Sequence, residues 1–148
     1  MAQGDGFIYN NFRERVMEGA FNLASAGDTI KVALLGTYTK NAANTVYGNV
    51  SGTEYNTGAG YTSGGETLSG QDVTEASTTG TFDASDLTWT SLGTLTPNHP
   101  VYAVMYRTAG SPANELIAAW ETSGTAPNGG NWTLQWGVNG IIILTGGE

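Results

Sequence analysis

Short runs of β-branched and aromatic residues, broken by Gly, Pro, Asn and Asp, fill most of this 148-residue chain and constrain its fold most strongly. Runs of this kind at hairpin-like spacing predict short antiparallel strands. We expect eight strands: Thr29–Thr37, Glu66–Glu75, Gly80–Phe82, Leu87–Leu92, Val101–Arg107, Glu115–Glu121, Trp132–Trp136 and Ile141–Leu144. No helix of crossover length is predicted between them, which argues against a parallel α/β sheet. The predicted fold class is therefore mainly β, an antiparallel β-sandwich or jelly-roll-like domain with one N-terminal α-helix.

The N-terminal region carries the helical pattern. Apolar side chains recur there at the spacing of one helix face: Phe12, Val16, Ala20, Leu23 and Ala24. This spacing predicts a helix over about residues 7–25 that covers one opening of the sandwich, and Gly27 is the candidate end. Gly19 weakens a continuous helix by about 1 kcal/mol relative to alanine. Residues 1–6 are Gly-rich and polar and predict a flexible arm, so residues 7–148 form the single domain.

Three of the expected strands are apolar on both faces: Lys31–Leu35, Val101–Tyr106 and Leu116–Trp120. A strand of this kind needs cover on each side, from a helix, a loop or a neighbouring subunit. One short helix covers one such patch, or two at most. We therefore expect a homo-oligomer, either a dimer or a trimer.

Composition excludes several classes of partner and site. Charged residues make up 12% of the chain, about half the usual share, and the net charge is -8 with only five scattered basic residues, so we expect no nucleic acid partner. The longest apolar run, Gly140–Leu144, is far too short to cross a membrane, so we expect no membrane partner. The chain has no cysteine, and its one histidine, His99, lies between Asn98 and Pro100 in a predicted turn. We expect no enzyme activity, no cofactor and no metal site.

Carboxylates and glycines provide weaker alternatives. Asp83 and Asp86 could act as a catalytic pair or as calcium ligands, but their position between two strands favours hydrogen bonds to the local backbone. The glycines of residues 58–65 resemble a phosphate-binding loop only faintly, because no lysine is present and a strand follows.

A long segment with little periodicity, Tyr38–Gly65, separates the first two expected strands. Loops of that length in compact domains are commonly functional or disordered, and four tyrosines make full disorder unfavourable here.

Several segments resemble those of a widespread family of small structural proteins of tailed bacteriophages. They read VSGT (50–53), GYTSGG (60–65) with Leu68, FDASDLTW (82–89), AAWE (118–121), NWTLQW (131–136) and Gly140–Ile141. The likeness extends from about Asp28 to Leu144.

The resemblance implies a virion component of the capsid decoration, or cement, type: a β-sandwich or jelly roll on the capsid exterior with the major capsid protein as its partner. The expected function is non-enzymatic stabilisation of the assembled capsid by an oligomer. We predict capsid contacts in the arm and the long loop, at Gln3, Asp5, Phe7, Tyr47, Glu54, Tyr55 and Tyr61. Strand-borne Trp89, Trp120 and Trp132 are predicted to lie in the core or the subunit interface.

The alternative function is a receptor- or glycan-binding module of a tail or fibre. It requires aromatic side chains that form a solvent-facing platform for sugar rings. The four tryptophans and seven tyrosines supply candidates for such a platform. A hydrolase on the same scaffold would need two converging carboxylates, and the sequence pairs none.

Overall fold

A computed structural model describes residues 4–56, 58–95 and 98–146, and its strands pair only in antiparallel fashion. The strands are β1 (Gly6–Ile8), β2 (Ile30–Leu35), β3 (Glu66–Thr67), β4 (Asp72–Ala76), β5 (Thr79–Asp83), β6 (Leu87–Trp89), β7 (Tyr102–Arg107), β8 (Leu116–Glu121), β9 (Trp132–Leu134) and β10 (Ile142–Thr145). The helices are α1 (Asn10–Met17) and two 3₁₀ turns, η1 (Tyr47–Asn49) and η2 (Ser51–Thr53). The predicted mainly-β sandwich with one α-helix is confirmed for the described residues. The jelly-roll variant stays a prediction.

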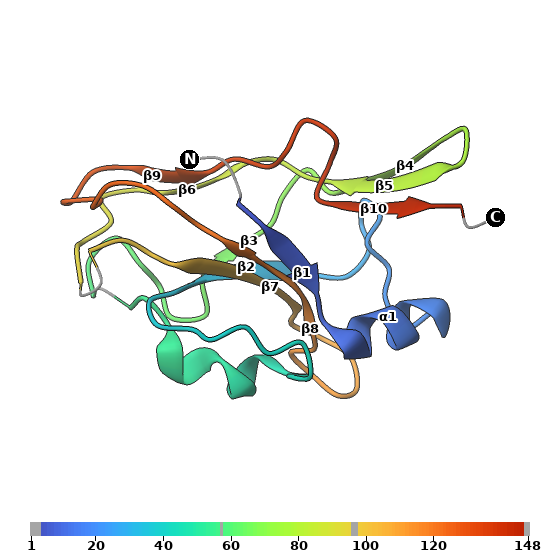
Figure 1. Ribbon diagram of the computed structural model, residues 1–148, viewed down its shortest axis with the longest axis horizontal. Coiled ribbons are helices and arrows are strands. Elements are labelled where there is room, and N and C mark those ends of the chain that lie inside the picture. Colours follow the sequence, from blue (N-terminus) through green and yellow to red (C-terminus); the bar gives the residue numbers. More distant parts are fainter. Residues whose placement is uncertain (1–3, 57, 96–97, 147–148) are drawn as a thin grey trace.

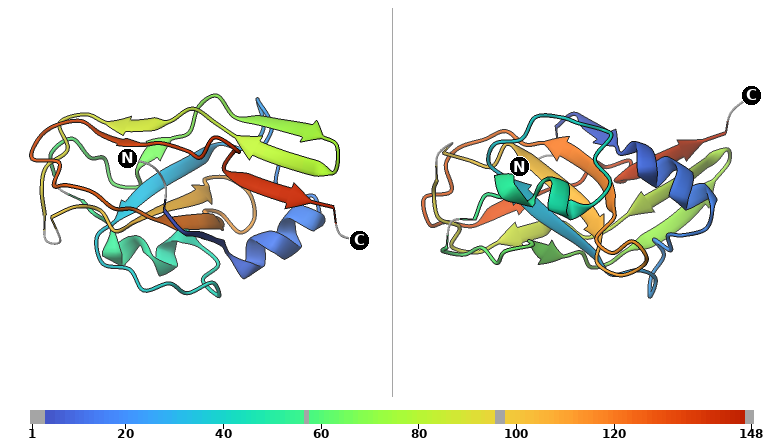
Figure 2. Two further views of the ribbon diagram at one scale, coloured as in Figure 1. Left: turned by 45° about the horizontal axis from the view of Figure 1, so that its top comes forward. Right: turned by 90° about the horizontal axis from the view of Figure 1, so that it is seen from below.

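The strands form three sheets arranged in layers (Figure 1). A five-stranded sheet with the order β1-β8-β7-β2-β3 lies in the middle. A three-stranded sheet (β10-β5-β4) and a two-stranded sheet (β6-β9) lie together over one of its faces. The segment that carries η1 and η2 lies over the opposite face, and α1 lies at the end of the sandwich near β10 (Figure 2).

The central sheet has an apolar core on each of its faces. Alternation along β2 sends Ile30, Val32 and Leu34 toward the smaller sheets. The intervening Ala33 and Leu35 face the other way and join a second core, which Tyr9, Val50 and Tyr106 complete. The chain therefore covers both apolar faces of its own strands. A neighbouring subunit is not needed for this cover, so the argument for an oligomer from two-faced strands was wrong.

The N-terminal region departs from the prediction. Gly6–Ile8 forms β1 in place of helix, paired with β8, and α1 ends at Met17. Gly19 adopts a positive φ of 76°, which glycine takes at little cost, so the chain turns there instead of at Gly27. The described part of the arm is also fixed, because Gly4 N donates to Glu121 O (2.8 Å). Pairing with a sheet edge thus overrides the local composition.

The expected strands lie close to the observed ones, with one exception. Residues 66–75 form two strands in two different sheets, β3 and β4. Gly70, at a φ of 65°, turns the chain between them, and its position brings Ser85 so close that a Cβ would overlap the Ser85 hydroxyl. A glycine in a strand-like pattern here marks the crossing from one layer to the other.

Candidate binding surfaces

The described part of the long segment Tyr38–Gly65 is hydrogen-bonded to the central sheet. The Glu54 carboxylate accepts hydrogen bonds from Tyr61 OH (2.7 Å), Ser63 Oγ (3.0 Å) and Gly64 N (2.5 Å). Tyr61 OH in turn accepts from Leu34 N of β2 (3.1 Å), which ties the segment to a central strand. A carboxylate with this many donors fixes the loop geometry.

Four of the predicted capsid contacts lie in this segment, and two of them are buried. Tyr55 is 1% exposed and Tyr61 is 9% exposed, so neither side chain is available to a partner, and their predicted role as contacts was wrong. Tyr47 is half-buried and stacks on Tyr106 with ring centroids 4.3 Å apart. Glu54 is half-buried, with its oxygens engaged as described. The segment is therefore a structural element more than a contact surface.

Burial also raises the proton affinity of these phenols. Burial, reinforced by the Glu54 carboxylate, raises the pKa of Tyr61 and of Tyr47 well above the usual range. Burial raises the pKa of Tyr106 to about 12, and its hydroxyl donates to Gly64 O (2.7 Å). On the same face, burial and the Tyr38 hydroxyl raise the pKa of Tyr9.

The N-terminal contact candidates divide into three cases. Asp5 is exposed, so its carboxylate is available to a partner. Phe7 is half-buried, packs edge-on against Tyr9 (4.9 Å between centroids), and lies 4.9 Å from the Lys40 ammonium. Gln3 lies outside the described residues.

The tryptophans belong to the core. Trp89 is 1% exposed, and Trp120 and Trp132 are each 5% exposed. Trp89 and Trp132 meet across the two-stranded sheet with centroids 5.7 Å apart. Trp120 contacts Trp136 edge-on at 5.2 Å. Of the two predicted locations, core or subunit interface, these tryptophans lie in the core. They do not form the solvent-facing platform that sugar stacking requires.

Several of the carboxylates serve the fold. Asp83 Oδ1 accepts from Ala84 N (2.9 Å) and Asp86 Oδ1 from Trp136 N (2.9 Å), which confirms the predicted backbone role of both aspartates. Fully buried Glu115 pairs with Arg107 and with Arg15 Nε (3.0 Å), and so ties α1 to the sheet.

Among the described residues, no group of three His, Asp or Glu side chains is placed to hold a metal ion. In the same part of the chain, no helix has the length and hydrophobicity of a membrane span.

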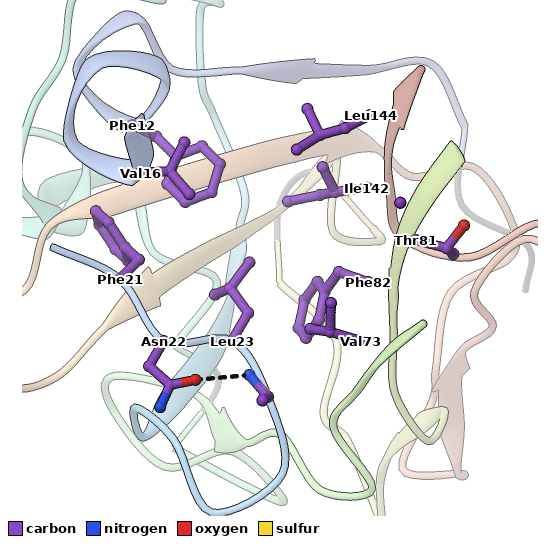
Figure 3. Close-up of a pocket in the computed structure, with 12 residues that line it drawn as sticks. Phe12, Val16, Phe21, Asn22, Leu23, Val73, Thr81, Phe82, Ile142 and Leu144 are labelled. Carbon is purple, nitrogen blue, oxygen red and sulfur yellow. Dashed lines mark hydrogen bonds between the residues drawn. The ribbon is translucent and has the colours of Figure 1, made fainter. Parts of the chain in front are cut away.

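An apolar groove of about 300 Å³ opens between α1 and the three-stranded sheet (Figure 3). Phe12 and Val16 of α1 form one wall with Phe21 and Leu23, while Phe82, Val73, Ile142 and Leu144 face them from the sheet. Asn22 lies at the rim, where its Oδ1 accepts from Ala24 N (3.2 Å). We call this surface the apolar groove.

A second opening, of about 480 Å³, lies where two sheets approach each other. Its lining residues come from β1 and the chain just before it, from α1, from β8 and from β10: Gly4, Asp5, Gly6, Phe7, Ile8, Arg13, Ala118, Trp120, Ile141, Ile142 and Ile143. Among the described strands, β1 pairs only with β8 and β10 only with β5, so each is an edge strand. We call this opening the edge slot.

Neither the apolar groove nor the edge slot was predicted from the sequence. The exposed large apolar side chains in the described residues are Met17, Val73, Leu95, Val138, Ile143 and Leu144. Val73 and Leu144 line the apolar groove, and Ile143 lines the edge slot. Met17, which is 88% exposed, ends the helix that forms one wall of the groove. A continuous apolar run predicted a strand over Ile141–Leu144, but nothing in that run indicated that Ile143 and Leu144 are exposed.

Comparison with known proteins gives no relative. No protein-family model, no curated protein and no solved structure matches this chain.

Proposed function

We propose that the chain is a non-enzymatic structural protein of a tailed-phage virion that binds the outer surface of the assembled capsid and stabilises it. One observation carries this proposal most directly: the described surface offers an apolar groove and a slot between strand edges, which suit the binding of another polypeptide. The resemblance of the loop and strand segments to phage decoration proteins supports the same function.

The physical mechanism of stabilisation is linkage. A protein that binds the assembled shell but not its free subunits shifts the equilibrium toward the shell by RT ln(1 + [L]/Kd). The net charge of -8 suits the capsid exterior, because an acidic chain is repelled by packaged DNA.

The proposal includes self-association, which is now inferred from exposed apolar side chains and no longer from two-faced strands. The two-faced strands are covered by the chain itself, but Val73 and Leu144 of the apolar groove remain exposed at the end that carries β10. A neighbouring copy on the shell, in a dimer or trimer, would cover them, and several contacts made together strengthen attachment.

Co-sedimentation tests the function. The purified chain is mixed with expanded shells, and separately with immature shells, of the phage that encodes it. We expect saturable retention at regular stoichiometry by expanded shells and little retention by immature ones. Shells that retain none of the chain at micromolar concentration would contradict the proposal.

The glycan-binding alternative has lost its main support, because all four tryptophans are buried in the described structure. A glycan array separates it from decoration. We expect no hits, and a reproducible hit that competes with shell binding would favour the tail or fibre role.

A further inference from the structure

The edge slot lies between two strand edges that run in the same direction. In Figures 1 and 2, β1 leads into α1 and β10 runs toward the same end of the molecule. Tyr9 N donates to Ile117 O (3.1 Å), so the alternation of an antiparallel pair turns the backbone groups of Gly6 and Ile8 away from β8. Gly146 N donates to Thr78 O (2.8 Å), so the same alternation turns those of Ile143 away from β5. These three residues all line the slot.

The position of the slot between two strand edges determines which kind of polypeptide segment can bind there. A strand placed there has one neighbour on each side, so it must arrive with both of its own edges free. The β10 strand of a second copy already carries β5 on one edge, and that β5 would meet β1 of the first copy. A lone extended segment fits without this conflict and can lie antiparallel to both edges, as in strand addition to other sheets.

The lining of the slot indicates the chemistry of that segment. The Trp120 indole lies directly against Gly6, where a Cβ would overlap the ring, and only 5% of Trp120 is exposed. Trp120 and Ile142 contribute small exposed apolar areas to the slot. Ile143, which is 44% exposed, adds a larger one against which alternate side chains of an added strand can pack. Arg13 lies at the rim and has no ion pair within the described residues, in a chain whose net charge is -8. The complementary segment is apolar on one side and carries a carboxylate opposite Arg13.

We propose that an extended segment of the capsid subunit, with this alternation and a carboxylate, adds as a strand between β1 and β10. The inference rests on the proposed function and specifies its contact. Strand addition would join the three-stranded and five-stranded sheets into one continuous sheet, which removes two exposed edges at once.

The test removes one backbone donor from the slot. Ile143→Pro takes away an N–H that faces the slot, at a position in an edge strand where proline is tolerated because the N–H does not pair with β5. Retention by expanded shells is measured as a Kd for this variant and for Ile143→Thr, which shortens the same side chain but keeps the N–H. We expect roughly three- to tenfold weaker binding for Ile143→Pro and a Kd for Ile143→Thr close to that of the wild type. Thermal unfolding of each variant verifies that it is folded.

A second pair of variants tests the charge and does not touch the strand. Arg13→Glu should weaken retention by roughly two- to fivefold at low salt, and the difference should shrink as salt is raised. Arg13→Lys keeps the charge and should bind like the wild type. If shells retain Ile143→Pro and Arg13→Glu as tightly as the wild type, the slot is not the contact, while decoration itself stands. If shells never retain the wild type, both proposals are overturned.

Discussion

Tyr61 shows how a single side chain can hold the long loop in place against a central strand. Its hydroxyl accepts from Leu34 N and donates to Glu54, so one side chain joins a central strand to the long loop. From the sequence, this tyrosine was predicted to be a capsid contact because it lies in the long loop with little periodicity. The hydrogen bond that decides its burial spans 27 positions in the sequence, and local composition carries no information about it.

Removal of the Tyr61 hydroxyl should destabilise the folded protein. Tyr61→Phe leaves the buried Leu34 N–H without its acceptor, so we expect the free energy of unfolding to fall by about 1–3 kcal/mol in urea denaturation. Tyr102→Phe is the matched control. Its hydroxyl donates to Glu121 at 3.0 Å in an exposed position, and its loss should cost about 0.5 kcal/mol. Equal losses in the two variants would show that Tyr61 does not tie the loop to β2.

Alkaline pH should unfold the protein through its tyrosines. The folded state holds the phenol protons of Tyr9, Tyr47, Tyr61 and Tyr106 more tightly than the unfolded chain does. Stability is therefore unaffected below pH 10, the ordinary tyrosine value, and falls as pH rises from there toward the folded pKa, about 12 for Tyr106. Absorbance at 295 nm should show an early group of exposed tyrosines, then a cooperative group that ionises together with loss of circular dichroism. A single unperturbed titration of all the tyrosines would contradict this account.

Glycines have opposite roles in different strands and turns. Gly65 has a φ of 77° and lies against β2, where a Cβ would overlap the Val32 carbonyl oxygen. Gly80 lies within β5, and a Cβ there would meet no atom within 4 Å. The sequence shows both as glycines in a β-rich segment and does not separate them.

Matched alanine substitutions should separate them by thermal or chemical denaturation. Gly80→Ala should raise the free energy of unfolding by about 0.4–1 kcal/mol, because alanine restricts the unfolded chain and fits the strand. Gly65→Ala should lower it by more than about 1 kcal/mol, since it adds both backbone strain and a clash. Stabilisation by both substitutions would contradict the described packing of residues 64–66 on β2.

The attachment of α1 depends on a buried charge cluster. Glu115→Gln leaves Arg107, which is 4% exposed, without its main carboxylate partner, and we expect a loss of about 3 kcal/mol or more. Arg15→Gln removes the solvent-exposed partner and should lower the free energy of unfolding by much less than Glu115→Gln does. Comparison of urea midpoints measures both, and a neutral Glu115→Gln would contradict the importance of the cluster.

For the whole molecule, periodicity and turn residues were enough to predict the sandwich class, the one N-terminal helix and most strands. They could not predict which segment covers which face. The apolar faces of β2, β7 and β8 suggested a neighbouring subunit, yet the chain's own loop lies on them (Figure 1). That cover depends on distant contacts such as Tyr9 with Tyr38, which no local pattern encodes. The apolar groove and edge slot were missed for the same reason, because they form where separate sheets end.

A cryo-EM map of expanded shells decorated with the purified chain tests both capsid binding and the site of contact. We expect the chain at regular sites on the capsid exterior, with the β10 end toward the shell and an extended capsid segment between β1 and β10. Shells without added density, or density that attaches through the loop over residues 38–56 and leaves the slot empty, would contradict this account.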